Sequence, residues 1–233
     1  MWGVGFKIKS KFGHFRNPYT TTFKQSYPFP PKPTIIGMIG AICGWDEKIV
    51  IEKMNKFKIA IPFWNNKGKT IEFIFIIRHG KVASNQRFGP ERFEILLYPE
   101  FELLIFESDK EIVKEIEERI KKGDFVFPLF MGKNEFIISE IEVTRSLFET
   151  ELRRINIPSG IIFVENNYIP EFYSVKEKIP PPEIFIGVPK LLSLSNGKRI
   201  QKEVCLALAS KAPIRVVEKL EGVKLNEFEY TVI

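Results

Sequence analysis

The first 27 residues interleave cations, aromatic rings and hydroxyl groups. The cations are Lys7, Lys9, Lys11, Arg16 and Lys24, the rings are Phe12, Phe15, Tyr19, Phe23 and Tyr27, and the hydroxyls are Thr20, Thr21 and Thr22. Rings of this kind stack on unpaired bases, cations attract phosphates, and hydroxyls bond phosphates or ribose. One interpretation is therefore a surface for single-stranded RNA. The other is that many of these rings belong to a core.

A second group of cations brackets the polar segment KVASNQRFGPER, residues 81–92. Its members are Arg78, Lys81, Arg87 and Arg92. At the end of a protruding hairpin, such a group can reach along a nucleic-acid backbone. An ordinary solvated loop tip explains the same composition equally well.

His14 and His79 are the only histidines, so imidazole-based proton transfer near neutral pH would have to use one of them. A hydrogen-bonded histidine without chemistry is the alternative for each. The glutamates of residues 111–118 lie among lysines, which indicates the solvated face of a helix and not a catalytic carboxylate pair.

Two histidines and two widely separated cysteines, Cys43 and Cys205, cannot form a metal-ligand cluster. Glycine-rich phosphate loops and a G-x-S-x-G nucleophile motif are absent as well. The sequence therefore predicts neither a metal nor a cofactor.

The formal net charge is +6 and the isoelectric point is about 9.1. This charge favours an anionic partner, with nucleic acid before a membrane surface. The lysine-rich surface of a protein from a thermophile is the alternative explanation. The start of the chain lacks the features of a signal peptide, and its longest apolar run is too short to span a bilayer. We expect a soluble, cytoplasmic protein with no membrane partner.

Apolar alternation and β-forming composition predict strands in the first 143 residues, at 2–9, 57–64, 70–80, 93–99, 101–108 and 125–143. NNKGK (65–69) is expected to be a hairpin turn between the second and third of these. A helix is expected from about Ile35 to Cys43, with Thr34 as its N-cap after the extended arm YPFPPKPT.

A second helix is predicted over residues 108–123, capped by Ser108 and Asp109 and ended by Gly123. Without an insertion, the element order is βαββαβ. This order defines an α+β, ferredoxin-like unit, which also underlies RNA-recognition motifs.

Residues 146–233 are rich in β-forming residues and prolines, and GKRIQKEVCLALASK is compatible with a helix or a strand. Short strands are expected around Glu221 and Gly222. We therefore expect residues 1–145 to form the ferredoxin-like domain, and residues 146–233 a β-rich C-terminal region.

The run GHFRNPYTTTFKQSYPFPPKPTIIGMIGAICG resembles the N-terminal signature of the CRISPR-associated Cas-five family, in the RAMP superfamily. That signature has an Arg- and Thr-bearing loop, a YPFPPPT-like arm and a GLLGAxLG-like helix. RFEILLYPEFELLIFES and PLFMGKNEFI are similar to two later elements of the family, in the same order, although the latter departs at Phe130 and Asn134.

The resemblance implies a ferredoxin-like domain with an inserted β-hairpin thumb at about residues 64–98. It also implies antiviral defence: binding of the CRISPR RNA (crRNA) 5′ handle within a type I Cascade surveillance complex, beside the backbone subunit and the large subunit. The implied RNA contacts are Arg16, Tyr19, Thr20, Thr21, Thr22, Lys24 and Tyr27, with Lys81, Arg87 and Arg92 at the thumb.

One branch of the family instead cleaves precursor RNA without metal, as an endoribonuclease that uses tyrosine with adjacent lysine and histidine. Here the candidates would be His14 or His79 with Lys7 or Lys81, and Arg78-His79 is the nearest approximation to the adjacent pair. Arginine gives up a proton poorly because its pKa is too high, so RNA binding is favoured. A non-catalytic protein-interaction adaptor is the third possibility.

Overall fold

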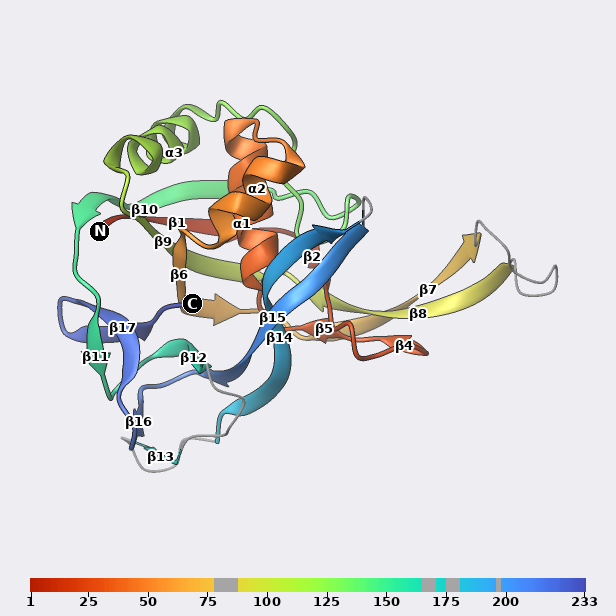
Figure 1. Cartoon of the computed structure of the whole chain (residues 1–233). Helices are drawn as coiled ribbons and strands as arrows, with labels where there is room; N and C mark the ends of the chain where they lie inside the picture. The colour runs from red at the N-terminus through yellow and green to blue at the C-terminus, as the bar shows by residue number, and fades with distance from the viewer. Residues whose placement is uncertain (78–87, 165–170, 175–180, 196–197) are drawn as a thin grey trace.

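The computed structural model describes residues 1–77, 88–164, 171–174, 181–195 and 198–233. Its centre is a seven-stranded antiparallel sheet in the order β10-β1-β9-β6-β12-β15-β14. Helices α1, α2 and α3 lie together over one face of this sheet (Figure 1). The largest hydrophobic core lies between these helices and the sheet.

The first half of the sheet has ferredoxin-like topology, as predicted. Its elements are β1 (Trp2–Lys9), α1 (Lys32–Cys43), β6 (Lys58–Asn65), β9 (Glu100–Glu107), α3 (Lys110–Lys122) and β10 (Glu140–Glu149). The four strands lie in the order fourth, first, third, second. Alternation along β1 explains its placement, because Val4, Phe6 and Ile8 are fully buried in the core while Lys7 and Lys9 point the other way.

A β-hairpin is inserted between β6 and β9, and it extends away from the body of the protein (Figure 1). It consists of β7 (Lys69–Ile77) and β8 (Phe88–Leu97), which pair along their whole length. Two predictions are corrected. NNKGK is not a hairpin turn, because β6 pairs with β9 and β12 and not with β7, and residues 88–92 are strand instead of loop. Residues 78–87 lie outside the described residues.

Helix α1 begins earlier than predicted. Its N-cap is Pro31, and Thr34 lies in the first turn, where its amide donates to the Pro31 carbonyl at 2.9 Å. The prediction that Thr34 is the N-cap is therefore wrong. Pro33 is tolerated because the first-turn amides need no intrahelical partner and the ring fixes a helical φ.

Helix α2 (Glu47–Met54) was not expected, although Asp46 caps it by accepting from the Ile49 amide at 2.9 Å. Helix α3 was predicted well, with Asp109 as its N-cap and the left-handed Gly123 (φ 66°) after its end. None of the helices in the described ranges is long and apolar enough to cross a membrane.

Residues 125–139 were expected to be strand but form turns with one isolated bridge, Phe130↔Ile137. Strand β10 begins only at Glu140. Pro128, Gly132 and a turn at Asn134 and Glu135 interrupt the strand pattern despite the apolar composition.

The C-terminal half supplies β11 (Arg153–Ile155), β12 (Gly160–Val164), β13 (Phe172–Ser174), β14 (Glu183–Ser195), β15 (Lys198–Ser210), β16 (Ile214–Val216), β17 (Leu220–Leu225) and β18 (Phe228–Thr231). The segment GKRIQKEVCLALASK, which was compatible with a helix or a strand, forms strand β15 over Lys198–Ser210. Short strands were expected around Glu221 and Gly222, and both residues lie inside β17; the turn to β18 is at Asn226, with φ 57°.

Strands β12, β15 and β14 extend the ferredoxin-like sheet, so the sheet continues across residue 145, which is itself within β10. The opposite face of the sheet is partly covered by β17 and β18, with a separate core that contains Leu104, Phe106 and Tyr230.

Replacing Gly132 or Gly37 by alanine is expected to change the stability of the protein in opposite directions. Gly132 has φ 89°, and an added Cβ would lie 2.0 Å from the His14 carbonyl oxygen. Gly132→Ala is expected to lower the free energy of unfolding by more than about 2 kcal/mol. Gly37 lies within α1 with open space around its Cβ position, so Gly37→Ala should raise that energy by roughly 0.5–1 kcal/mol. Urea unfolding of both variants tests this, and equal effects would contradict it.

Candidate nucleic-acid interface

The loop of residues 17–25 is held in one conformation by its own hydrogen bonds. Strands β3 (Phe15–Arg16) and β5 (Ser26–Tyr27) pair and close it. The Asn17 amide donates to the Gln25 carbonyl at 2.9 Å. The Thr20 hydroxyl donates to the Asn17 carbonyl and accepts from the Gln25 amide, both at 3.0 Å. The exposed side chains of the loop are therefore presented from a fixed backbone.

Beneath the loop, buried rings anchor the proline-rich arm. Tyr27 and Phe29 are 1% and 0% exposed. The Phe29 ring contacts Phe185 of β14 edge-on at 5.6 Å and Phe163 of β12 at 6.1 Å. The Tyr27 hydroxyl donates to the Gly187 carbonyl at 3.2 Å, and burial raises the Tyr27 pKa. Tyr27 thus positions the loop, and its ring is not accessible for stacking on a base.

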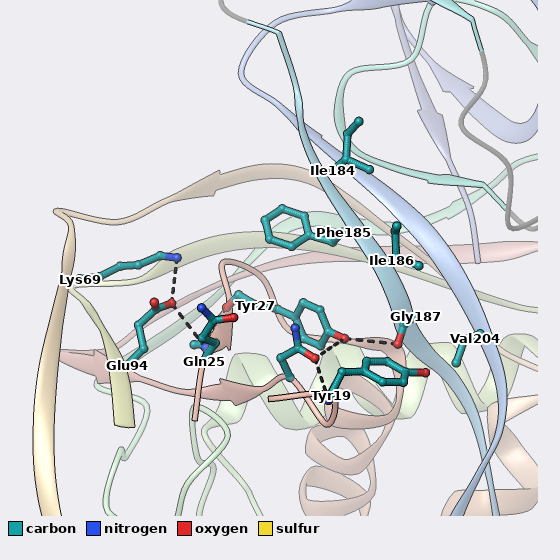
Figure 2. A pocket seen from close by; sticks show the side chains of 12 residues that line it. Tyr19, Gln25, Tyr27, Lys69, Glu94, Ile184, Phe185, Ile186, Gly187 and Val204 are labelled. Atoms are coloured by element: carbon teal, nitrogen blue, oxygen red, sulfur yellow. Dashed lines mark hydrogen bonds and ion pairs between the residues drawn. The ribbon is translucent and has the colours of Figure 1, made fainter. Parts of the chain in front are cut away.

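A cleft of about 680 Å³ opens between this loop, the base of the β7–β8 hairpin and β14 (Figure 2). We call it the loop cleft. Polar walls come from Asn17, Gln25, Lys69 and Glu94, and apolar walls from Tyr19, Ile184, Phe185 and Ile186. Its size lies within the range of sites that bind organic ligands, and its composition combines apolar contact with a few orienting polar groups.

Tyr19 is the ring that the loop presents to the outside, with 62% of its surface exposed. Its hydroxyl accepts a hydrogen bond from Gln201 Nε2 of β15 at 3.3 Å. Gly187 lies against this ring, because an added Cβ there would be 2.3 Å from Tyr19 Cε2. Tyr19 is therefore positioned by the C-terminal strands and still accessible for stacking.

Four other predicted contact residues are exposed: Arg16, Thr21, Thr22 and Arg92. The first three lie on or beside the loop. Arg92 lies on β8 opposite Phe73 of β7, and next to Phe23 of β4 (Phe23–Lys24) in a parallel pair. The hairpin and the loop therefore bring a guanidinium and two aromatic residues together across three strands.

The remaining cations that were predicted to contact RNA are either in an ion pair or outside the described residues. Lys24 is 8% exposed and its Nζ lies 3.5 Å from Glu91 Oε2, so this ion pair joins β4 to β8 of the hairpin. Lys69, which was not predicted, pairs with Glu94 at 2.8 Å on the cleft wall. Lys81 and Arg87 lie outside the described residues.

His14, a candidate for proton transfer, is a buried structural residue. It is 3% exposed, and its Nδ1 lies 2.7 Å from the Glu94 carbonyl oxygen, so that nitrogen carries the proton and donates. Its Nε2 is buried and has no hydrogen-bond partner, and its ring contacts Phe93. Lys7 forms an ion pair with Glu100 and lies over the Phe63 ring. His79 and Lys81 lie outside the described residues.

His14 predicts a pH dependence of stability. Burial lowers its pKa from the ordinary 6.5, and the nearby charges of Lys133 and Arg16 act in the same direction. As the pH falls, the unfolded chain therefore binds a proton at His14 before the folded chain does. The free energy of unfolding is unaffected by His14 above about pH 6.5 and decreases below that pH. Urea unfolding at pH 7 and pH 5 should show a larger loss for the wild type than for His14→Gln. Parallel losses would contradict this assignment.

Sequence patterns did not identify the far wall of the loop cleft. Ile184, Ile186 and Gly187 of β14 come to the loop from more than half the chain away, and nothing in their local sequence marks a site. Asn17 and Gln25 were overlooked because amides in a polar loop carry no distinctive spacing. Among the described residues, no group of three or more side chains could hold a metal ion.

Comparison with known proteins agrees with the fold described above. The chain is similar over its whole length to "Crystal structure of a CRISPR protein from Archaeoglobus fulgidus", with 13% identity, a TM-score of 0.55, and coverage of 100% of this chain and 99% of that one. A chain of a "CRISPR RNA-guided surveillance complex" matches with 14% identity and a TM-score of 0.51, covering 94% of this chain and 91% of that one. No curated protein sequence matches.

Identities this low establish the fold alone. The sequence also identifies the family. The model of one protein family, described as CRISPR-associated protein (Cas_Cas5), matches residues 3–158. This segment contains the loop, the proline-rich arm, the inserted hairpin and the complete ferredoxin-like unit. The chain therefore belongs to the Cas5 family of CRISPR-associated proteins.

Proposed function

We propose that this chain holds the 5′ handle of CRISPR RNA, as a subunit of a type I Cascade effector complex in antiviral defence. The observation that carries the proposal is the loop cleft, where an exposed, positioned Tyr19 lies among polar groups. Membership of the Cas5 family and the likeness to a chain of an RNA-guided surveillance complex support the same conclusion.

In this proposal the handle lies over the loop and along the base of the hairpin. One base stacks on Tyr19, and phosphates contact Arg16 and Arg92. The hydroxyls of Thr21 and Thr22 bond the sugar–phosphate backbone, while Thr20 and Tyr27 hold the loop in shape through their own hydrogen bonds. Lys81 and Arg87 remain proposed contacts at the tip of the hairpin.

A neighbouring subunit has a candidate surface on the hairpin. Ile71, Phe73 and Phe75 of β7 are 53%, 67% and 77% exposed on one face. A monomer rarely leaves such an apolar stripe open, and a partner protein would cover it. We propose the backbone subunit of the complex as this partner, with the large subunit as a second neighbour. Residues 1–145 supply the loop and hairpin, and residues 146–233 the far wall of the cleft.

The proposal is for binding and not for cleavage. Among the described residues that line the loop cleft there is no imidazole, and His14 is buried with one nitrogen already bonded. Imidazole is the side chain that most often transfers protons near neutral pH, so its absence from this lining favours binding. A cut in the repeat RNA would have to depend on residues elsewhere, such as His79.

Two arginine variants test the RNA contacts. Arg16→Ala and Arg92→Ala should each weaken binding of handle-containing RNA by several-fold. Each should also reduce the slope of log affinity against log salt concentration by about one, the amount expected for one lost phosphate contact. Arg215→Ala, which removes an exposed arginine from β16, is the matched control and should leave both unchanged. Filter binding over a salt series measures this. If all three variants bind alike, the loop and hairpin are not the RNA surface.

A further inference from the structure

The central sheet splits between β6 and β12. These strands pair at a single position, Ile61↔Ile161, although β6 continues to Asn65. Contact at that position is very close, because a Cβ added to Gly160 (φ 80°) would lie 2.3 Å from the Ile61 carbonyl oxygen. Beyond it the two strands separate, and a cavity of about 440 Å³ opens between β6, the start of β12, the end of β15 and β18. We call it the split cavity.

Aromatic rings form the walls of the split cavity. Phe63 and Trp64 come from β6, and Phe228 and Tyr230 from β18. Phe63 and Phe228 are 41% and 51% exposed, and the Phe228 and Tyr230 rings are nearly parallel, at 22° with centroids 6.4 Å apart. Rings that remain exposed beside a cavity are suited to a flat, apolar ligand group.

Cations lie over two of these rings. Lys211 Nζ is 5.5 Å from the Trp64 ring centroid, and Lys7 Nζ is 5.7 Å from that of Phe63. Lys7 also forms an ion pair with Glu100, whereas Lys211 is exposed and forms no ion pair with the other described residues. A second polar group is unused, because Trp64 Nε1 is buried and has no hydrogen-bond partner. Buried donors without a partner are rare in folded proteins, and a ligand acceptor would satisfy this one.

We propose that the split cavity binds one nucleotide unit of single-stranded RNA. The base stacks on the exposed rings of Phe63 and Phe228, the phosphate meets Lys211, and an acceptor on the ligand bonds Trp64 Nε1. Rings together with a cation match a nucleotide better than an apolar peptide, which would leave the ammonium unused. The site shares no residue with the loop cleft and does not depend on handle binding there.

Ultraviolet crosslinking of the whole chain to a short oligoadenylate tests this proposal, with the crosslinked peptides identified by mass spectrometry. Crosslinks are expected at residues 62–65 or 228–230. Phe228→Ala should weaken oligoadenylate binding at this site by roughly tenfold, Lys211→Ala by several-fold, and Trp64→Phe, which keeps a ring and removes the N–H, by a smaller factor. Phe127→Ala and Lys219→Ala alter exposed residues elsewhere and serve as matched controls.

The Tyr19→Ala variant separates this site from the loop cleft. Crosslinks at the split cavity should persist in that variant even if its handle binding is lost. Their absence from the wild-type protein would overturn the proposal, whatever happens at the loop cleft. So would binding of an aromatic peptide at the cavity without any crosslink to the oligonucleotide, because the site would then be a protein contact.

Discussion

Replacing Phe29 by alanine is expected to lower the free energy of unfolding by about 3–5 kcal/mol, the cost of removing a large ring from a closed core. Phe29 is fully buried, and its ring joins the proline-rich arm to Phe163 of β12 and Phe185 of β14 through edge-on contacts. Urea unfolding of the variant measures the loss.

Phe75→Ala is the matched control, because it makes the same chemical change at a ring that is 77% exposed. It should alter the unfolding energy by no more than about 0.5 kcal/mol. A small effect for Phe29→Ala would mean that the arm is held by its prolines and backbone, and that the aromatic anchor is not needed. A large effect for Phe75→Ala would mean that the hairpin face packs on something in the isolated chain.

Loss of the Tyr19 ring should produce the largest fall in RNA affinity. Tyr19→Ala removes one stacked base, worth about 1–3 kcal/mol, so the dissociation constant for handle-containing RNA should rise roughly tenfold or more. Tyr19→Phe keeps the ring and loses only the hydroxyl that accepts from Gln201, so it should bind nearly as well as the wild type. If Tyr19→Ala and Tyr19→Phe lost the same RNA affinity, the effect would come from the hydroxyl, and stacking on the ring would be contradicted.

Gly187→Ala tests the same contact from the other side. The added methyl group would overlap the Tyr19 ring, and the φ of 69° is unfavourable for alanine. The variant should therefore weaken RNA binding although every proposed contact residue is still present. Unchanged RNA affinity in a folded Gly187→Ala protein would show that the position of Tyr19 does not matter.

Short-range patterns predicted much of the fold. Helix α3 is defined by Asp109, Gly123 and a four-residue repeat of isoleucines, all within one segment. The alternation of Val4, Phe6 and Ile8 likewise identified the buried face of β1. Such signals act over a few residues, so the sequence around them is sufficient.

The candidate site depends on contacts between distant segments, and these were not predictable from local patterns. Tyr27 was predicted to be a possible stacking ring, but it is buried against β14. There its hydroxyl donates a hydrogen bond to the Gly187 carbonyl. Gln201 lies 182 positions after Tyr19. Lys24 looked like an RNA contact, but Glu91 on the hairpin pairs with it. In each case, the tertiary partner determines the role of the residue.

The central claim is that this Cas5-family chain holds the handle of CRISPR RNA and does not cut it. The most direct test is to incubate the purified protein with labelled repeat RNA over a salt series, with and without EDTA, and to measure binding and cleavage in the same samples. We predict binding that weakens steeply with salt, is reduced by Tyr19→Ala, and yields no product. A single metal-independent cut that is lost in His79→Ala would contradict this account and make the protein a processing nuclease.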